Sequence, residues 1–306
     1  MSKEKKLDVP VIKKQFWNRK RVLIILFTIL ILGFASFYGV KSMLLKNDDF
    51  VVNYVDIKTP NWVGMKPLRM VLIGDLHVSP GEKSLAKLRR IVSDANALDP
   101  DLTLLLGDYM NGRIKHQSAP YEIIADELSK LHAKLGVYAV MGNHEVWHGQ
   151  EKIIAAFEKH NIPTLENKYI TLKFHGEEFN LVGVSDYRSN RRVIWEKFMP
   201  PKSDKRPIVM FTHNPDIFPQ LDRPIAVLSA GHTHGGQVRL PKIGPLLIPS
   251  QYGRKYDYGV KEEEGNQMYI TSGAGSSVFA LRYNCPQEIV LMTLLAESKD
   301  SGRTNK

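Results

Sequence analysis

The chain has 306 residues, of which 43% are apolar, so it can bury one large core or two small ones. Its net charge of +10 is concentrated in residues 1–21, which hold eight Lys/Arg and two acidic residues. The other 285 residues hold 34 Lys/Arg and 30 Asp/Glu, so the body of the chain is nearly neutral. This disfavours binding to nucleic acid, and no nucleic-acid partner is expected. The single cysteine, Cys285, excludes an intramolecular disulfide and a cysteine-based zinc cluster.

The first predicted element is the uncharged, 19-residue segment 22–40, which lies between Arg21 and Lys41. It is long enough to cross a bilayer core of roughly 30 Å as a helix. A cleaved signal peptide is the alternative, with "GFA" at 33–35 as its cleavage site. The long polar tail before the segment favours an uncleaved transmembrane anchor. The positive-inside rule then places the basic tail, 1–21, in the cytoplasm and the body of the chain outside it.

Beyond the anchor, residues 41–67 are predicted to be a connector in which "VVNYVDIK" forms an edge strand, and apolar strands then alternate with helices. The expected strands are 68–75, 102–108, 136–145, 179–186, 206–215 and 225–234, and the expected helices are 79–98, 121–131 and 151–160. Alternation of this kind predicts parallel strand pairs. One folded domain over 68–296 and a disordered tail over 297–306 complete the prediction.

Five of these strands end in residues that can bind a metal ion. The strand ends supply Asp75 and His77 in "GDLH", Asp108 in "GD", Asn143 and His144 in "GNHE", His213 in "FTHNP", and His232 and His234 in "GHTH". In a parallel sheet, ligands gather beyond the carboxyl ends of the strands. Each residue alone has an ordinary explanation as a turn, a helix cap or a core histidine. The five together, in order along one chain, favour a metal site.

This set of motifs, spread over residues 69–236, resembles the D-x-H, GD, GNH[DE], H and GHxH blocks of the calcineurin-like metallophosphoesterase superfamily. The resemblance implies a four-layer α/β/β/α sandwich with a two-metal site, here preceded by one transmembrane helix. One metal would be held by Asp75, His77, Asp108 and His234, and the other by Asp108, Asn143, His213 and His232. His144 would be catalytic and would face the substrate.

The implied chemistry is attack on phosphorus by a hydroxide bound to two divalent ions. Manganese is the expected metal, with iron, zinc and magnesium as alternatives. His144 would stabilise the transition state or protonate the leaving oxygen. Glu145 either positions the loop or is a solvated residue.

Two further features narrow the substrate. Asn111 stands where protein phosphatases of the superfamily have the second aspartate of GDxxDRG, which disfavours that activity. The stretches 235–259 and 272–289 resemble a bacterial, membrane-associated branch of phosphodiesterases that includes UDP-2,3-diacylglucosamine pyrophosphatases. Arg282, in the second stretch, would bind a substrate phosphate or form a surface ion pair.

The expected function is therefore hydrolysis of a phosphodiester or pyrophosphate at the bacterial cytoplasmic membrane, with a lipid-linked substrate such as UDP-2,3-diacylglucosamine. A phosphomonoesterase and a non-catalytic metal-binding scaffold are the alternatives. The outward orientation conflicts with lipid A precursors, which are processed on the cytoplasmic leaflet. The apolar run 243–249 is either exposed to lipid, beside Arg254 and Lys255, or buried as a core contact, and burial is favoured.

Overall fold

The chain divides into two units, Met1–Leu45 and Lys46–Lys306. The computed structural model describes residues 19–46, 49–186, 194–277 and 281–297. Most of the predicted basic tail and nearly all of the predicted disordered tail lie outside these ranges.

The first unit contains α1, Arg19–Lys46, which includes the predicted anchor. Its segment Arg19–Gly39 has 21 residues and a mean hydropathy of 2.4, and none of its most apolar stretch is buried in the described structure. Length and composition allow the helix to cross a membrane, although a signal sequence would have the same properties.

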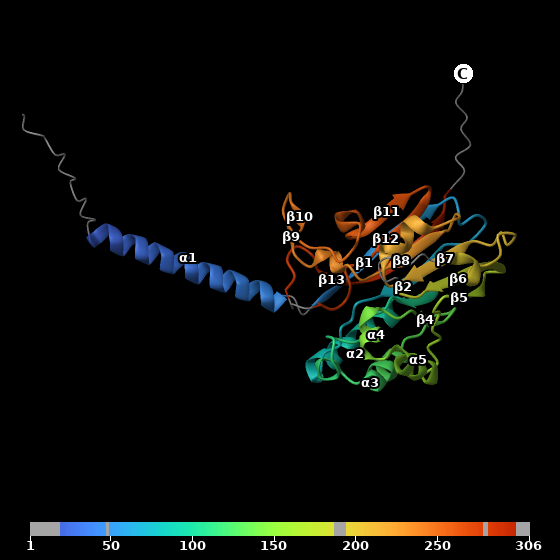
Figure 1. Cartoon of the computed structure of the whole chain (residues 1–306), viewed down its shortest axis with the longest axis horizontal. Coiled ribbons are helices and arrows are strands. Elements are labelled where there is room, and N and C mark those ends of the chain that lie inside the picture. The colour runs from blue at the N-terminus through green and yellow to red at the C-terminus, as the bar shows by residue number, and fades with distance from the viewer. Residues whose placement is uncertain (1–18, 47–48, 187–193, 278–280, 298–306) are drawn as a thin grey trace, which may run out of the picture. The chain divides into compact units, whose positions relative to one another are not determined.

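The second unit is built on two β-sheets, the first of which has five strands in the order β1-β13-β2-β3-β4 (Figure 1). The strands are β1 (Phe50–Thr59), β13 (Gln287–Ala296), β2 (Leu68–Ile73), β3 (Leu102–Leu105) and β4 (Val137–Ala139). β2, β3 and β4 are parallel, as expected, because a helix joins each strand to the next. β13 pairs antiparallel with β2 and parallel with β1, so the predicted edge strand β1 runs opposite to β2.

The second sheet has six strands in the order β11-β12-β8-β7-β6-β5. The strands are β5 (Lys168–Phe174), β6 (Glu177–Val184), β7 (Ile208–Thr212), β8 (Val227–Ala230), β11 (Gly259–Glu263) and β12 (Asn266–Ile270). The β6, β7, β8 and β12 strands are parallel, whereas β5 and β11 pair antiparallel at the two edges. A separate hairpin is formed by β9 (Arg239–Leu240) and β10 (Gly244–Pro245).

The sheets pack face to face around a buried apolar core that includes Trp62 and Phe179, whose ring centroids are 5.3 Å apart. The other face of the first sheet is covered by α2 (Glu82–Ala97), α3 (Tyr121–Leu128) and α5 (Gln150–Lys159). The other face of the second sheet is covered by short 3-10 helices, namely η2 (Trp195–Lys197), η3 (Pro215–Gln220) and η5 (Gly253–Tyr256). The predicted four-layer sandwich is therefore confirmed, and its fourth layer contains 3-10 helices rather than α-helices in the described residues.

One predicted strand is shorter than expected. The stretch 136–145 forms the three-residue β4 and then enters helix α4, Asn143–His148. The helix begins here because the Glu145 side chain accepts a hydrogen bond from the backbone N–H of Gly142, at 2.8 Å. Asn143 and His144 therefore lie in the first turn of a helix.

Candidate metal centre

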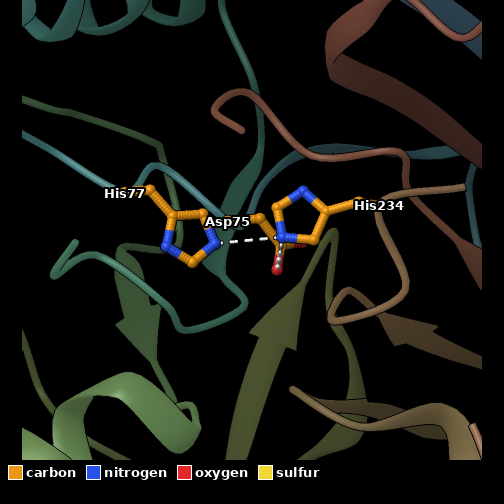
Figure 2. Close-up of side chains that lie close together, drawn as sticks. All are labelled: Asp75, His77 and His234. Atoms are coloured by element: carbon orange, nitrogen blue, oxygen red, sulfur yellow. Dashed lines mark hydrogen bonds and ion pairs between the residues drawn. The ribbon is translucent and has the colours of Figure 1, made fainter. Parts of the chain in front are cut away.

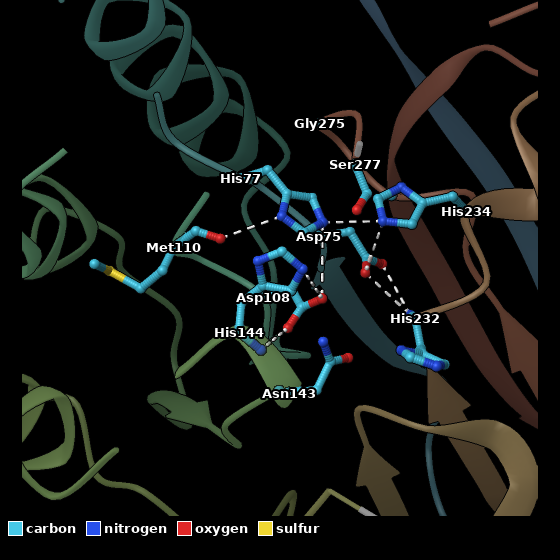
Figure 3. Close-up of polar contacts among 12 residues, drawn as sticks. Asp75, His77, Asp108, Met110, Asn143, His144, His232, His234, Gly275 and Ser277 are labelled. Atoms are coloured by element: carbon cyan, nitrogen blue, oxygen red, sulfur yellow. Dashed lines mark hydrogen bonds and ion pairs between the residues drawn. The ribbon is translucent and has the colours of Figure 1, made fainter. Parts of the chain in front are cut away.

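The carboxyl ends of strands from both sheets meet at one edge, and all the predicted ligands lie there. Figure 3 shows this arrangement for the residues that it labels, which include Asp75, Asp108 and His232. Asp75 and His77 follow β2, Asp108 follows β3, Asn143 and His144 follow β4, His213 follows β7, and His232 and His234 follow β8. The fold thus brings together side chains as distant in the chain as His77 and His234, which are 157 residues apart.

Asp75, His77 and His234 form what we call the first ligand group (Figure 2). Nε2 of His234 lies 3.0 Å from Nε2 of His77 and 3.5 Å from Oδ1 of Asp75. All three side chains are buried. Their nitrogen and oxygen atoms therefore point at one common position.

Asn143, His213 and His232 form the second ligand group. Nε2 of His213 lies 3.2 Å from Oδ1 of Asn143 and 3.0 Å from Nδ1 of His232. The other ring nitrogen of His213, Nδ1, lies 2.9 Å from the carbonyl oxygen of Leu106, to which it donates. That bond directs Nε2 of His213 into the group.

Asp108 lies between the two groups. Its Oδ2 is 3.7 Å from Nε2 of His77 in the first group and 3.3 Å from Nε2 of His213 in the second. Its Oδ1 accepts a hydrogen bond from the backbone N–H of His144, at 2.9 Å. One carboxylate therefore contacts both groups, as a bridging ligand must.

The donor atoms fit two divalent cations. Two ligand atoms that each lie about 2.1 Å from one ion are about 3.0–3.4 Å apart at octahedral or tetrahedral angles. The separations within the two groups, 3.0 to 3.5 Å, match this range. Imidazole nitrogens with carboxylate and amide oxygens suit manganese, iron or zinc.

The protonation states of His77 and His232 also suit metal ligands. Burial lowers the pKa of both His77 and His232 to about 3, so both are neutral at neutral pH and each has a free lone pair. Burial alone would lower the pKa of His213, but the neighbouring Asp108 carboxylate raises it well above its usual value. Burial raises the pKa of Asp75 to about 7, and a bound cation would favour its ionised form.

Five of the predicted ligands have a strained backbone. The φ angles are positive at Asp75 (54°), His77 (45°), Asp108 (56°), His232 (71°) and His234 (51°). Residues other than glycine rarely adopt this left-handed conformation, which costs of order 1–3 kcal/mol each. Backbone strain that is concentrated at one set of neighbouring residues indicates a functional site, because the surrounding structure must hold each residue in this conformation.

Glu145 joins the loop that carries Asp108 to the loop that carries His144. It is fully buried, and its two oxygens accept four backbone N–H bonds, from Asp108, Tyr109, Met110 and Gly142, at 2.8 to 3.0 Å. The solvated alternative for Glu145 is therefore wrong. A Cβ at Gly142 would overlap Oδ1 of Asp108, so only glycine allows this close approach.

His144 faces a cavity of about 810 Å³ beside the two ligand groups. Its ring packs edge-on against His77 and at a tilt against Trp147, each with a centroid distance of 4.5 Å. Its Nδ1 is buried and has no hydrogen-bond partner in the described structure. This imidazole is therefore placed to contact a molecule in the cavity.

The cavity wall contains residues that the motifs did not reveal. Ile114, Trp147, Leu247 and Pro249 give it an apolar part, and the Arg113 guanidinium stacks over Trp147 at 4.7 Å. Trp147 could have been expected, because it lies one helical turn after Asn143 and His144.

Arg282 lies behind the site. It is only 3% exposed, and its Nη2 donates to the carbonyl oxygens of Ser272 and Gly275 at 2.6 and 2.5 Å. The same nitrogen lies 3.1 Å from Nδ1 of His234. Arg282 is not among the described residues that line the cavity, and its burial excludes the surface ion pair. This location suits a residue that positions His234.

The sequence model of the calcineurin-like phosphoesterase family matches residues 68–236, more than half of the chain. The chain belongs to that family. The predicted fold class and the predicted enzyme class, a metal-dependent phosphoric ester hydrolase, are thereby confirmed.

Named relatives agree with this class. The phosphodiesterase YaeI of Escherichia coli strain K12 is 31% identical over 240 residues, which cover 75% of this chain and 83% of that protein. The uncharacterized metallophosphoesterase YkuE of Bacillus subtilis strain 168 is 26% identical over 234 residues, 76% of this chain and 80% of that protein. A transmembrane protein with metallophosphoesterase domain from Danio rerio is 27% identical over 242 residues, 74% of this chain and 53% of that protein.

Proposed function

We propose that this chain is a membrane-anchored phosphodiesterase that uses two divalent cations to hydrolyse a phosphodiester or pyrophosphate bond. The observation that carries the proposal is the convergence of both ligand groups, Asp108 and His144 beside one cavity. Asp108 with the first group would hold one ion, and Asp108 with the second group the other. When bound, the two ions would supply Lewis-acid polarisation of the phosphoryl oxygens and activation of a water molecule.

The side chains of the site would do the rest. His144 is neutral at neutral pH, because burial lowers its pKa. The N–H of its neutral ring can donate a hydrogen bond to an oxygen of the substrate and so stabilise the negative charge that develops there. Glu145 would keep Asp108 and His144 at a fixed distance through its four backbone bonds, and Arg113 could contact a negatively charged part of the substrate.

A lipid-linked substrate such as UDP-2,3-diacylglucosamine would suit the apolar part of the cavity. Ile114, Trp147 and Leu247 line it and remain at least 40% exposed, so they would gain contacts when an apolar group enters. The relative named a phosphodiesterase supports a diester over a monoester.

The anchor would be α1, in a bacterial cytoplasmic membrane, with the N-terminus in the cytoplasm. The exposed apolar side chains of α1 and the relative named a transmembrane protein support this proposal. Accessibility of the second unit to protease added outside intact cells tests the orientation. Degradation of that unit supports the outward location, and protection until the membrane is disrupted contradicts it.

The activity is tested with the full chain in detergent and added Mn²⁺. The substrates are bis-p-nitrophenyl phosphate, p-nitrophenyl phosphate and UDP-2,3-diacylglucosamine, with Asp108→Asn as the control. The proposal predicts Mn²⁺-dependent hydrolysis of a diester or pyrophosphate, which is lost in the control. Hydrolysis of the monoester alone would favour the phosphomonoesterase. Two bound ions without hydrolysis of any of the three would favour the scaffold.

A further inference from the structure

The turn of the β9–β10 hairpin and the two residues after β10 present an exposed apolar surface, which we call the apolar tip. Ile243 is 54% exposed, Leu246 58% and Leu247 78%, whereas Pro245 between them is buried. The favoured expectation that the run 243–249 is a buried core contact is therefore wrong for its largest side chains. Three large apolar side chains held in water by a short hairpin indicate a surface that another apolar phase covers.

Basic side chains flank this tip. Lys242 is exposed in the turn of the hairpin, and the exposed Arg254 donates from Nη1 to the carbonyl oxygen of Ile243, at 2.7 Å. Neither forms an ion pair with a carboxylate of the described residues, whereas Lys255 pairs with Glu263, at 2.6 Å. An apolar tip with two neighbouring cations that form no ion pair with a described carboxylate matches a bilayer surface that contains anionic lipids.

The hairpin is packed directly on the metal centre. Gly236, two residues after the ligand His234, has a positive φ of 75°, and a Cβ there would lie 2.6 Å from Cβ of Pro245. Leu247, which lies two residues after Pro245, lines the cavity. The same segment therefore forms both the apolar tip and one side of the cavity mouth.

Two other residues that line the cavity have the same character. Ile114 is 50% exposed and Trp147 is 40% exposed, and both line the cavity. Tryptophan is enriched where proteins meet the interface of a membrane. The cavity lining thus includes exposed apolar side chains from three segments, at Ile114, Trp147 and Leu247.

The covalent path of the chain leads to this same edge. β1 begins at Phe50, which pairs with Gln287, and it runs opposite to β2. The start of β1 therefore lies at the edge where β2 ends and where Asp75 follows. Helix α1 ends at Lys46, and the three residues up to Phe50 span at most about 15 Å. The chain therefore enters the second unit at the edge that carries the metal centre.

We propose that the β9–β10 hairpin is a membrane-docking surface that inserts Ile243, Leu246 and Leu247 into the bilayer interface and turns the cavity mouth toward the lipid headgroups. This inference rests on the anchor in the proposed function. Docking would present a phosphodiester of a membrane lipid to the metal centre without complete extraction of the lipid from the bilayer.

Site-specific fluorescence quenching tests the docking. Full chains carrying Ile243→Cys or, separately, Leu246→Cys are labelled with an environment-sensitive dye and reconstituted into vesicles of phosphatidylcholine and phosphatidylglycerol. Cys285, the only native cysteine, is buried and does not compete for the dye. Val63→Cys is the matched control, because Val63 is 66% exposed in the loop between β1 and β2, at the opposite edge.

The vesicles contain a lipid with a doxyl quencher near the headgroup end of its acyl chain. We expect this lipid to quench the fluorescence of a dye at position 243 or 246 about twofold or more strongly than that of a dye at position 63. Equal quenching at the three positions, or none at 243 and 246, would overturn the docking. Mn²⁺-dependent hydrolysis of bis-p-nitrophenyl phosphate by the same vesicles reports separately on the catalytic proposal. Flotation of the protein with the vesicles reports on the anchor, and its failure would remove the basis of the docking.

Discussion

The two ligand groups differ in charge and in access to the cavity. The first group has a carboxylate of its own, Asp75, and all of its members are buried, whereas the second has the uncharged Asn143 instead. Asn143 and His232 are only partly buried and both line the cavity, whereas in the first group only the buried His234 does. A cation with two carboxylate ligands is bound more tightly than one with a single carboxylate. We therefore expect a tightly held ion in the first group and a more exchangeable one next to the substrate.

The largest effect is expected where the groups are joined. Asp108→Asn removes the one negative charge that both groups share, and it keeps the side-chain shape. We expect a loss in kcat of more than about 100-fold, since changes even beyond the direct ligands cost 10- to 100-fold. Loss of both ions in equilibrium dialysis with Mn²⁺ would support the shared role. Retention of two ions by the variant would show that the groups are independent.

Removal of the Glu145 charge tests whether a residue outside both groups aligns them. Glu145→Gln keeps the size but cannot accept all four backbone N–H bonds, because one oxygen becomes an NH₂ group. We expect about 10- to 100-fold lower kcat with the chain still folded by circular dichroism. The control is Glu151→Gln, because Glu151 is an exposed residue of α5, and this variant should keep the kcat of the unchanged protein. An equal kcat for the two variants would show that Glu145 does not align the two ligand groups.

Adding a charge to the second group should make the groups more alike. Asn143→Asp supplies the carboxylate that this group lacks. A charge near a cation strengthens binding by well over the 1.4 kcal/mol that corresponds to tenfold, so the weaker Mn²⁺ dissociation constant should fall by about tenfold or more. Calorimetric titration measures both sites. No change in the weaker site would mean that Asn143 does not contact that ion.

The smallest effect is expected behind the first group. Arg282→Lys keeps the charge but loses the fork that contacts Ser272, Gly275 and His234. We expect about tenfold weaker Mn²⁺ binding in the first group, with the second group unchanged. A change in KM for the diester without any change in Mn²⁺ binding would instead indicate a direct contact with substrate.

Much of the fold and of the candidate centre could be predicted from the sequence. Apolar segments of strand length, each followed by Asp, Asn or His, define both the strands and the edge at which the ligands meet. That is why residues as distant as Asp75 and His234 could be assigned to one site. The resemblance to the family then divided them between two ions, and that division stays a prediction.

Other features depend on contacts that a single sequence does not encode. Glu145 looks like a surface residue, because its four partners are backbone groups that only the folded loops bring together. The burial of Arg282 depends on carbonyl groups of the preceding loop. The run 243–249 was expected to be buried, yet Ile243, Leu246 and Leu247 are exposed and only Pro245 is buried. The positive φ angles of the ligands likewise follow from tertiary packing.

The central claim is that two ions lie on either side of Asp108. Anomalous diffraction from crystals of the full chain grown with Mn²⁺ tests it most directly. The account predicts two anomalous peaks about 3.5–4 Å apart, one in each ligand group, with Oδ2 of Asp108 between them. A single peak, or peaks away from Asp108, would contradict it.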